Sequence, residues 1–185
     1  TTGSTGKVIA MEPNPNIVRR LHANLELNRI QNCQVLQTAL SNKEGITNFF
    51  VAKDTYFHQG KSSLQQSSEL TETITIQTMT GRNLFQKIGS RNCSFIKVDV
   101  EGHDFIVLQE LEEIISTYRP HIVFEYDQKS WHNHGCEINQ ALDFFKEHAY
   151  ALYSLKNGLL SPLNISYPAN CDFLCVPHNN GQSSS

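Results

Sequence analysis

Acidic and histidine side chains gather at the ends of two apolar runs. The first run, residues 7–11, ends at Glu12. The second, residues 94–100, contains Asp99 near its end and is followed by Glu101 and His103. A carboxylate can orient hydroxyl groups or accept a proton, and an imidazole suits a base that works near neutral pH. The pattern therefore predicts a site that handles hydroxyl groups and protons.

Each of these residues also has a structural alternative. Glu12 could be a solvated strand end, and Glu101 could satisfy free amides at the start of the next helix. Asp99 and Glu101 flank Val100, so in an extended strand they would point to opposite faces. They can meet one ligand only if the strand has ended, which Gly102 favours.

Two further features call for a structural interpretation before a chemical one. Lys97 lies inside the second run, and a buried lysine needs a carboxylate partner, so we expect a structural ion pair. Residues 131–136 read Trp-His-Asn-His-Gly-Cys, and His132, His134 and Cys136 could supply three metal ligands. Zinc ligands are more often separated by two or more residues. We therefore expect no metal site, and interpret the segment as an acceptor-binding loop or plain surface.

Strand-like and helix-like segments alternate along the chain. Expected strands cover residues 7–12, 33–40, 47–52, 73–79, 94–100, 121–126, 150–155 and 171–176, with helices at 15–32, 83–88, 103–118 and 138–148. The strand–helix–strand unit at 94–126 is a right-handed crossover and implies a parallel pair. The pattern predicts an α/β fold with a doubly wound, mostly parallel sheet and flanking helices. In such sheets ligands bind at the carboxyl ends of the strands, where the acidic residues lie.

Length and composition bound the remaining possibilities. The 185 residues suffice for one domain, expected at 1–178, with a polar disordered tail at 179–185 and a long surface loop at 53–72. The 15 basic and 18 acidic residues give a net charge of -3, so no nucleic-acid partner is expected. No apolar run reaches the ~20 residues of a membrane span. The five cysteines are odd in number and form no Cys-x-x-Cys pair, which favours a reducing, cytoplasmic location.

Two motifs resemble the FkbM family of S-adenosylmethionine-dependent methyltransferases. Residues 6–15, Gly-Lys-Val-Ile-Ala-Met-Glu-Pro-Asn-Pro, resemble the second-strand signature of that family. Residues 96–104, Ile-Lys-Val-Asp-Val-Glu-Gly-His-Asp, resemble its most specific stretch, Ile-Lys-Ile-Asp-Val-Glu-Gly-x-Glu. Shorter matches support them: Asn24 with Asn28, residues 39–41, residues 62–64, and Arg119-Pro120 with Glu125. Together the matches cover about residues 3–127.

The resemblance implies a Rossmann-like class I domain that uses S-adenosylmethionine. Its expected reaction is methyl transfer to an oxygen of a sugar or small-molecule acceptor. The expected cofactor contacts are Glu12 on the ribose hydroxyls, together with Pro13, Ala39, Leu40 and Asp99. Asp99 would also lie beside the transferring methyl group, and Glu101 or His103 would take the proton from the acceptor.

The sequence departs from the family pattern in three places. The usual opening strand and its glycine loop, Asp-x-Gly-Ala-Asn-x-Gly, have no counterpart here, so we expect the first strand and loop to be missing. Thr80 stands where the family has the Asp of Thr-Leu-Asp, and Asp104 stands for the last Glu of the crossover motif. Two alternatives remain open: a nicotinamide-dependent oxidoreductase on the same kind of sheet, and a non-catalytic remnant or binding module.

Overall fold

The structure is a computed structural model of the chain. It describes residues 2–3, 5–52, 62–63, 71–89, 92–156, 159–163 and 169–178. The predicted surface loop at 53–72 lies mostly outside the described residues, and the predicted tail at 179–185 lies wholly outside them.

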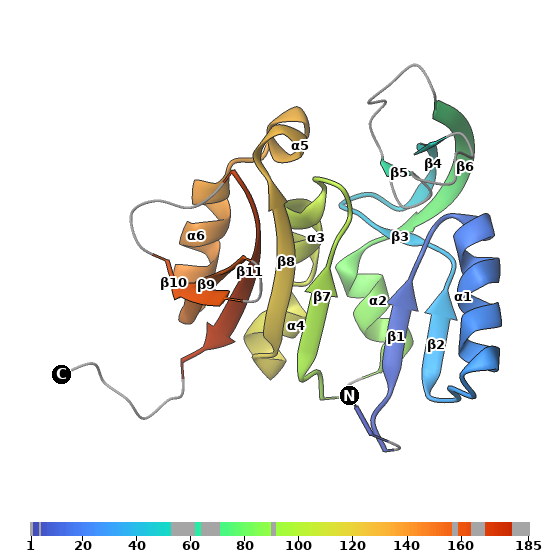
Figure 1. Cartoon of the computed structure of the whole chain (residues 1–185), viewed down its shortest axis with the longest axis horizontal. Coiled ribbons are helices and arrows are strands. Elements are labelled where there is room, and N and C mark those ends of the chain that lie inside the picture. The colour runs from blue at the N-terminus through green and yellow to red at the C-terminus, as the bar shows by residue number, and fades with distance from the viewer. Residues whose placement is uncertain are drawn as a thin grey trace.

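A five-stranded sheet forms the larger part of the fold (Figure 1). Its strands run in the order β10-β9-β11-β8-β7, with bounds Leu159–Pro162, Tyr150–Lys156, Asn170–Pro177, His121–Asp127 and Phe95–Val98. Only β7 and β8 are parallel, because the returns to β11, β9 and β10 reverse the chain direction. The predicted α/β class is confirmed, but the sheet is mixed where we expected a mostly parallel one. The sequence analysis also missed β10, whose four residues are all exposed.

The amino-terminal part contributes two smaller sheets. Parallel strands β1 (Val8–Met11) and β2 (Cys33–Leu36) are connected by α1 (Pro15–Leu27). The predicted cap is confirmed, since the Asn14 side chain accepts from the amide of Asn16, 2.9 Å away, and Pro15 begins the helix.

The other small sheet has the strand order β3-β6-β4-β5, with bounds Ala39–Leu40, Thr71–Met79, Gly45–Ala52 and Ser62–Ser63. The expected single strand at 33–40 is therefore divided between two sheets. Thr38 marks the division, because its hydroxyl donates to the carbonyl of Gln77 across 3.1 Å.

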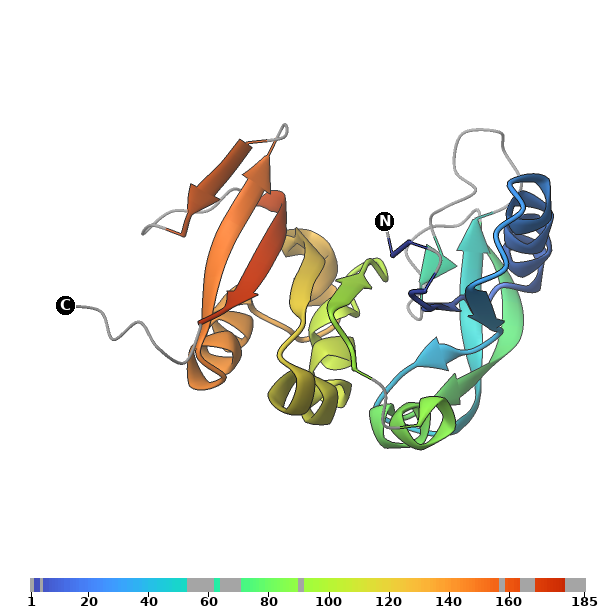
Figure 2. The same ribbon diagram turned by 90° about the horizontal axis from the view of Figure 1, so that it is seen from below.

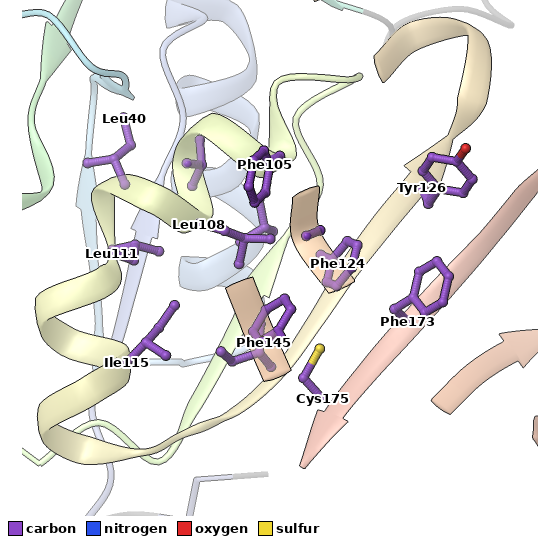
Figure 3. Close-up of a cluster of buried hydrophobic side chains, with 14 of the residues drawn as sticks. Leu40, Phe105, Leu108, Leu111, Ile115, Phe124, Tyr126, Phe145, Phe173 and Cys175 are labelled. Atoms are coloured by element: carbon purple, nitrogen blue, oxygen red, sulfur yellow. The ribbon is translucent and has the colours of Figure 1, made fainter. Parts of the chain in front are cut away.

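Helices cover one face of the five-stranded sheet (Figure 3). The crossover from β7 to β8 carries α3 (Asp104–Glu110) and α4 (Glu112–Tyr118), and the later connection carries α5 (Gln128–Asn133) and α6 (Ile138–Glu147). Helix α2 (Gly81–Ile88) lies against α3 and α4. Fully buried side chains from these helices and strands form one core, including Leu108, Ile115, Ile122, Phe124, Phe145 and Phe173. Burial of this apolar surface is the main force that holds the helices on the sheet.

The predicted helix at 103–118 is two helices. Leu111 divides it with backbone angles φ -90° and ψ 5°, and its amide is shared between the carbonyls of Val107 and Leu108. The break lets both helices turn apolar residues to the core, where Leu111 is itself buried.

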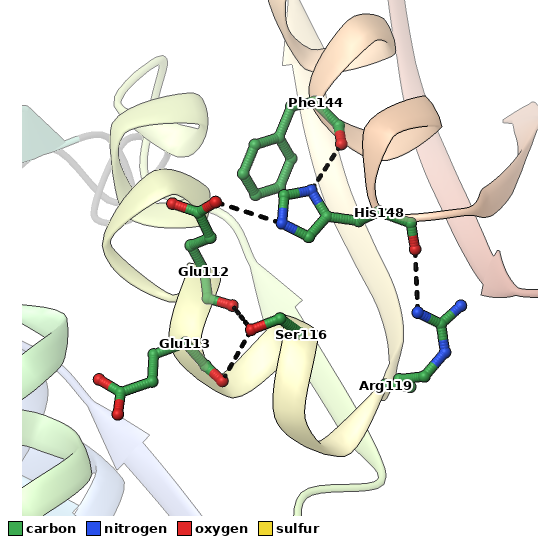
Figure 4. A network of polar contacts seen from close by, with 6 residues as sticks. All are labelled: Glu112, Glu113, Ser116, Arg119, Phe144 and His148. Atoms are coloured by element: carbon green, nitrogen blue, oxygen red, sulfur yellow. Dashed lines mark hydrogen bonds and ion pairs between the residues drawn. The ribbon is translucent and has the colours of Figure 1, made fainter.

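A polar network ties α4 to the end of α6 (Figure 4). Arg119 ends α4 in the left-handed conformation, with φ 51°, and donates to the carbonyls of His148 and Ala149 at 3.0 and 2.9 Å. The His148 ring faces the Glu112 carboxylate, 3.2 Å from Nε2, and the carbonyl of Phe144, 2.7 Å from Nδ1. These contacts fix the corner where Pro120 leads into β8.

Strands β1 and β7 face each other with unpaired edges. Among the described residues β1 pairs only with β2, and β7 pairs only with β8. Both strands point the same way in Figure 1, and Figure 2 shows no described strand between them. No helix formed by the described residues is long and apolar enough to cross a membrane.

Candidate cofactor and catalytic site

Two carboxyl groups meet at the carboxyl ends of β7 and β8. The parallel register places Val98 beside Phe124, so Asp99 and Glu125 are the next pair. The charge of Asp99 acts on the carboxyl group of Glu125, so the two groups lie close together. Burial, followed by the charges of Asp99, Glu101 and Asp104, raises the pKa of Glu125 to about 7.

Lys97 forms the ion pair that the sequence predicts. Its Nζ lies 2.5 Å from Oδ2 of Asp99. The expected burial is wrong, however, because the side chains of Lys97 and Asp99 are 60% and 47% exposed. The pair therefore lies on the open face of the sheet, where solvent weakens its contribution to stability.

The chain turns sharply after β7. The strand ends at Val98, two residues earlier than the expected end at residue 100, and Glu101 and Gly102 have φ values of 53° and 96°. A Cβ atom on Gly102 would lie 2.7 Å from the Cβ of Ser130 and 2.8 Å from its carbonyl oxygen. Glycine is required here both for the backbone conformation and for the close approach of α5.

The side chain of Asp104 stabilises this turn through hydrogen bonds. Its buried carboxylate accepts from the amide of Val100 at 3.3 Å and from that of Gly102 at 3.1 Å. Burial raises the pKa of Asp104 to about 6, although these backbone hydrogen bonds act in the opposite direction. The sequence points to Glu101 as a candidate for satisfying such amides, whereas the structure gives this role to Asp104. A carboxylate at the first position of a helix, two residues after a glycine, was the available signal.

His103 is buried beside the turn, with an exposed fraction of 9%. Neither ring nitrogen has a hydrogen-bond partner among the described residues, and the ring packs edge-on against His134, with centroids 5.4 Å apart. Burial, aided by the charge of His134, lowers the pKa of His103 to about 4. The imidazole is therefore neutral at physiological pH and a weaker base than an ordinary histidine.

The buried imidazole should make the fold sensitive to acid. The folded-state pKa of about 4 lies below the ordinary 6.5, so stability falls as pH decreases through this window. We expect His103→Gln to reduce this loss by about 1–2 kcal/mol near pH 5. Denaturant unfolding near pH 5 and pH 7.5 measures it, with the exposed His22→Gln as the matched control. An unchanged pH dependence in the His103 variant would contradict the assignment.

Glu12 lies at the other candidate strand end. One carboxylate oxygen accepts from the amide of Asn14, 2.7 Å away, and burial raises the pKa of Glu12. The side chain lines a hollow of about 450 Å³ with residues of β1 and α1: Ala10, Met11, Ile17, Arg20, Leu21 and Asn24. A half-buried carboxylate beside apolar walls can recognise a group with hydroxyls and a flat apolar part.

Ala39 and Leu40 are placed differently from Glu12. They form β3 and pair with Thr78 and Met79 in another sheet. Leu40 is buried in the main core, and Ala39 packs against a smaller core of Phe49, Val51 and Ile76. Their side chains are thus occupied by packing, and only their backbone is suited to a ligand.

A comparison with protein families gives a match over most of the chain. The family model of the methyltransferase FkbM domain matches residues 1–152. The chain belongs to the FkbM methyltransferase family. The crystal structure of an FkbM methyltransferase from Methylobacillus flagellatus is similar, with a TM-score of 0.52 and 13% identity. The match covers 91% of this chain and 36% of that one, so this chain spans about a third of its length. No curated protein matches the chain in sequence.

In this FkbM-family domain, helix α5 lies against the turn that follows β7, with Ser130 close to Gly102. Helix α5 is not predicted by the sequence, because its 6 residues are too few to show a helical period. Buried Trp131 anchors it by donating from Nε1 to the carbonyl of Glu125 across 3.2 Å. A hollow of about 460 Å³ beside α5 is lined by Gln128, Lys129, His132, Glu137, Ala169 and Asn170.

His132, His134 and Cys136 are not arranged as a metal site. His132 pairs with Glu137 at 2.9 Å, His134 packs on His103, and Cys136 is buried. In the described part of the chain, no three His, Cys, Asp or Glu side chains are placed to hold a metal ion.

Proposed function

We propose that this domain transfers a methyl group from S-adenosylmethionine to a hydroxyl oxygen of a sugar or another small molecule. The observation that carries the proposal is that Asp99 and Glu125 follow the last paired residues of β7 and β8 and lie close enough to influence each other, in a chain of the FkbM methyltransferase family. Carboxylates at this edge suit an acceptor that must be oriented and deprotonated.

The residues around Glu12 fit the nucleoside part of the cofactor. Its carboxylate offers two acceptor oxygens to the ribose hydroxyls, and the walls formed by Ala10 and Met11 are apolar. Pro13 directs the chain away from this position, while Ala39, Leu40 and Asp99 complete the proposed contacts. The cofactor supplies a methyl group on a positively charged sulfur, and the domain contributes alignment and exclusion of water.

Asp99 positions the acceptor hydroxyl in this proposal, and a neighbouring group takes its proton. Glu101 is the more accessible of the two predicted bases, because the ring of His103 is buried. Glu125 adds a third carboxyl at the same edge, with a pKa raised to about 7. The hollow beside α5 is lined by donor and acceptor side chains such as Lys129 and Glu137, which suit a hydroxyl-rich acceptor.

The facing edges of β1 and β7 support a further element of the proposal. Both strands leave one edge unpaired among the described residues. Unpaired edges of parallel strands are suited to a strand that lies between them. We assign this place to the first strand and glycine loop that the resemblance implies. They would complete the domain that residues 1–178 form in part.

The proposed location is a reducing compartment, the cytoplasm. The five cysteines are free thiols, and Cys136 and Cys175 are buried. Buried thiols of this kind behave as small apolar side chains.

Thermal shift separates the methyltransferase from the oxidoreductase alternative. The protein, prepared with any residues its gene places before Thr1, should be stabilised by S-adenosylhomocysteine and not by NAD, because a ligand that binds only the folded state raises the unfolding temperature. Stabilisation by NAD alone would favour the oxidoreductase. An absence of both shifts would favour a non-catalytic module.

A further inference from the structure

Asp104 is a buried charge that the proposed reaction does not use. It is fully buried at the first position of α3, and its two carboxylate oxygens accept from two amides of the same turn. Oδ1 accepts from the amide of Val100, and Oδ2 accepts from the amide of Gly102. The carboxylate therefore braces both ends of the segment that contains Glu101.

The brace holds a backbone that is unfavourable by itself. Glu101 has a φ of 53°, in the left-handed region that side chains with a Cβ atom avoid. Such conformations persist only where surrounding contacts determine them. Asp99 immediately precedes this segment, so the direction of its side chain depends on the same turn.

Folding stability alone does not explain why a carboxylate is buried at this position. Burial raises the pKa of Asp104 to about 6, so ionisation of this carboxyl group is less favourable in the folded protein than in the unfolded chain. Its folded-state pKa lies above the ordinary 3.8, and stability therefore falls as pH rises between these values. A charge that the fold holds at a cost in stability is typical of a functional site.

We propose that Asp104 is a positioning residue, whose carboxylate holds the turn at residues 99–102 in the form that presents Asp99 at the sheet edge. This inference rests on the methyltransferase function proposed above. Asp104 does not touch the reactants, and it acts through the backbone amides on Asp99. The titratable groups coupled to it electrostatically are Asp99 after β7, Glu125 on β8 and the neutral thiol of Cys136 after α5.

The backbone contacts are tested by NMR without any ligand. The amide protons of Val100 and Gly102 should shift together with pH, with a midpoint near the pKa of about 6 of Asp104. This shift should vanish in Asp104→Asn and remain in Asp143→Asn, a control on the exposed side of α6. If the shift persists in Asp104→Asn, a neighbouring carboxyl causes it and the inference is overturned.

The action through Asp99 is tested with S-adenosylhomocysteine as the probe. Asp104→Asn should weaken its binding about tenfold, the effect of losing hydrogen bonds to a charged group. In an Asp99→Asn background the same change should weaken binding less than about twofold, because both changes remove one function. Equal losses in the two backgrounds would overturn the inference.

A second variant distinguishes the loss of the charge from a general loss of folding. Asp104→Glu keeps the charge and should restore part of the affinity that Asp104→Asn loses. An affinity as low as that of Asp104→Asn would count against a role for the charge. If the unaltered protein does not bind S-adenosylhomocysteine, the proposed function fails and the action through Asp99 fails with it, while the amide titration still decides whether Asp104 holds the turn.

Discussion

Gly102→Ala should lower the free energy of unfolding by about 3 kcal/mol or more, because two unfavourable effects combine. The residue has a φ of 96°, which is strained for alanine. Its new Cβ would also lie 2.8 Å from the carbonyl carbon and oxygen of Ser130, so α5 would have to move. Chemical denaturation with both circular dichroism and Trp131 fluorescence measures the loss, and the indole reports on α5 directly.

Gly135→Ala is the matched control for this change. Gly135 has a φ of 72°, but a Cβ there meets nothing within 4 Å. It should cost only the backbone strain, about 1–2 kcal/mol. Equal losses at the two positions would show that the contact between the turn and α5 carries no energy.

Asp99→Asn should lower the rate of methyl transfer by about 10²–10⁴, the range for a positioned polar group in acid–base chemistry. The substitution is nearly isosteric, so packing after β7 should persist. It removes the charge that faces Lys97 and acts on the carboxyl group of Glu125. Single-turnover transfer of a labelled methyl group to a hydroxyl acceptor measures the rate, and the denaturant midpoint of the same preparation measures stability.

Lys97→Gln separates the two roles of Asp99. It breaks the exposed ion pair but leaves the Asp99 carboxyl in place, and should cost less than about 1 kcal/mol of stability. If Asp99→Asn instead lowers the midpoint and preserves turnover, the carboxylate is scaffolding and its catalytic assignment is withdrawn.

Local patterns were sufficient to predict much of the fold. The cap at Asn14 and Pro15, the existence of strand β7 and the crossover into β8 all depend on contacts between neighbours in sequence, although β7 ends two residues earlier than expected. The break at Leu111 could not be predicted, because an unbroken apolar period of three and four residues describes one helix as well as two. The mixed sheet depends on where β11 and β9 return, which is a long-range property.

The site was predictable in its residue types and less so in its contacts. The sequence predicts Glu12 and Asp99 near the ends of strands. The hydrogen bonds from the turn to Asp104 depend on the turn conformation, and the placement of Asp99 near Glu125 depends on the strand register. The neutral state of His103 likewise depends on burial by residues distant in sequence. Sequence identifies groups capable of chemistry, and packing then decides which of them are exposed to a ligand.

Calorimetry of S-adenosylhomocysteine binding to Glu12→Gln tests the central claim most directly. The amide must present a donor where the carboxylate offered an acceptor, so the ribose hydroxyls lose a charged partner. We expect a loss of about 1.5–3 kcal/mol of binding free energy, with an unchanged unfolding midpoint. Glu26→Gln, at an exposed position of α1, should bind like the unaltered protein. If Glu12→Gln also binds with unchanged affinity, Glu12 is only a solvated strand end, and the cofactor site proposed at the end of β1 is wrong.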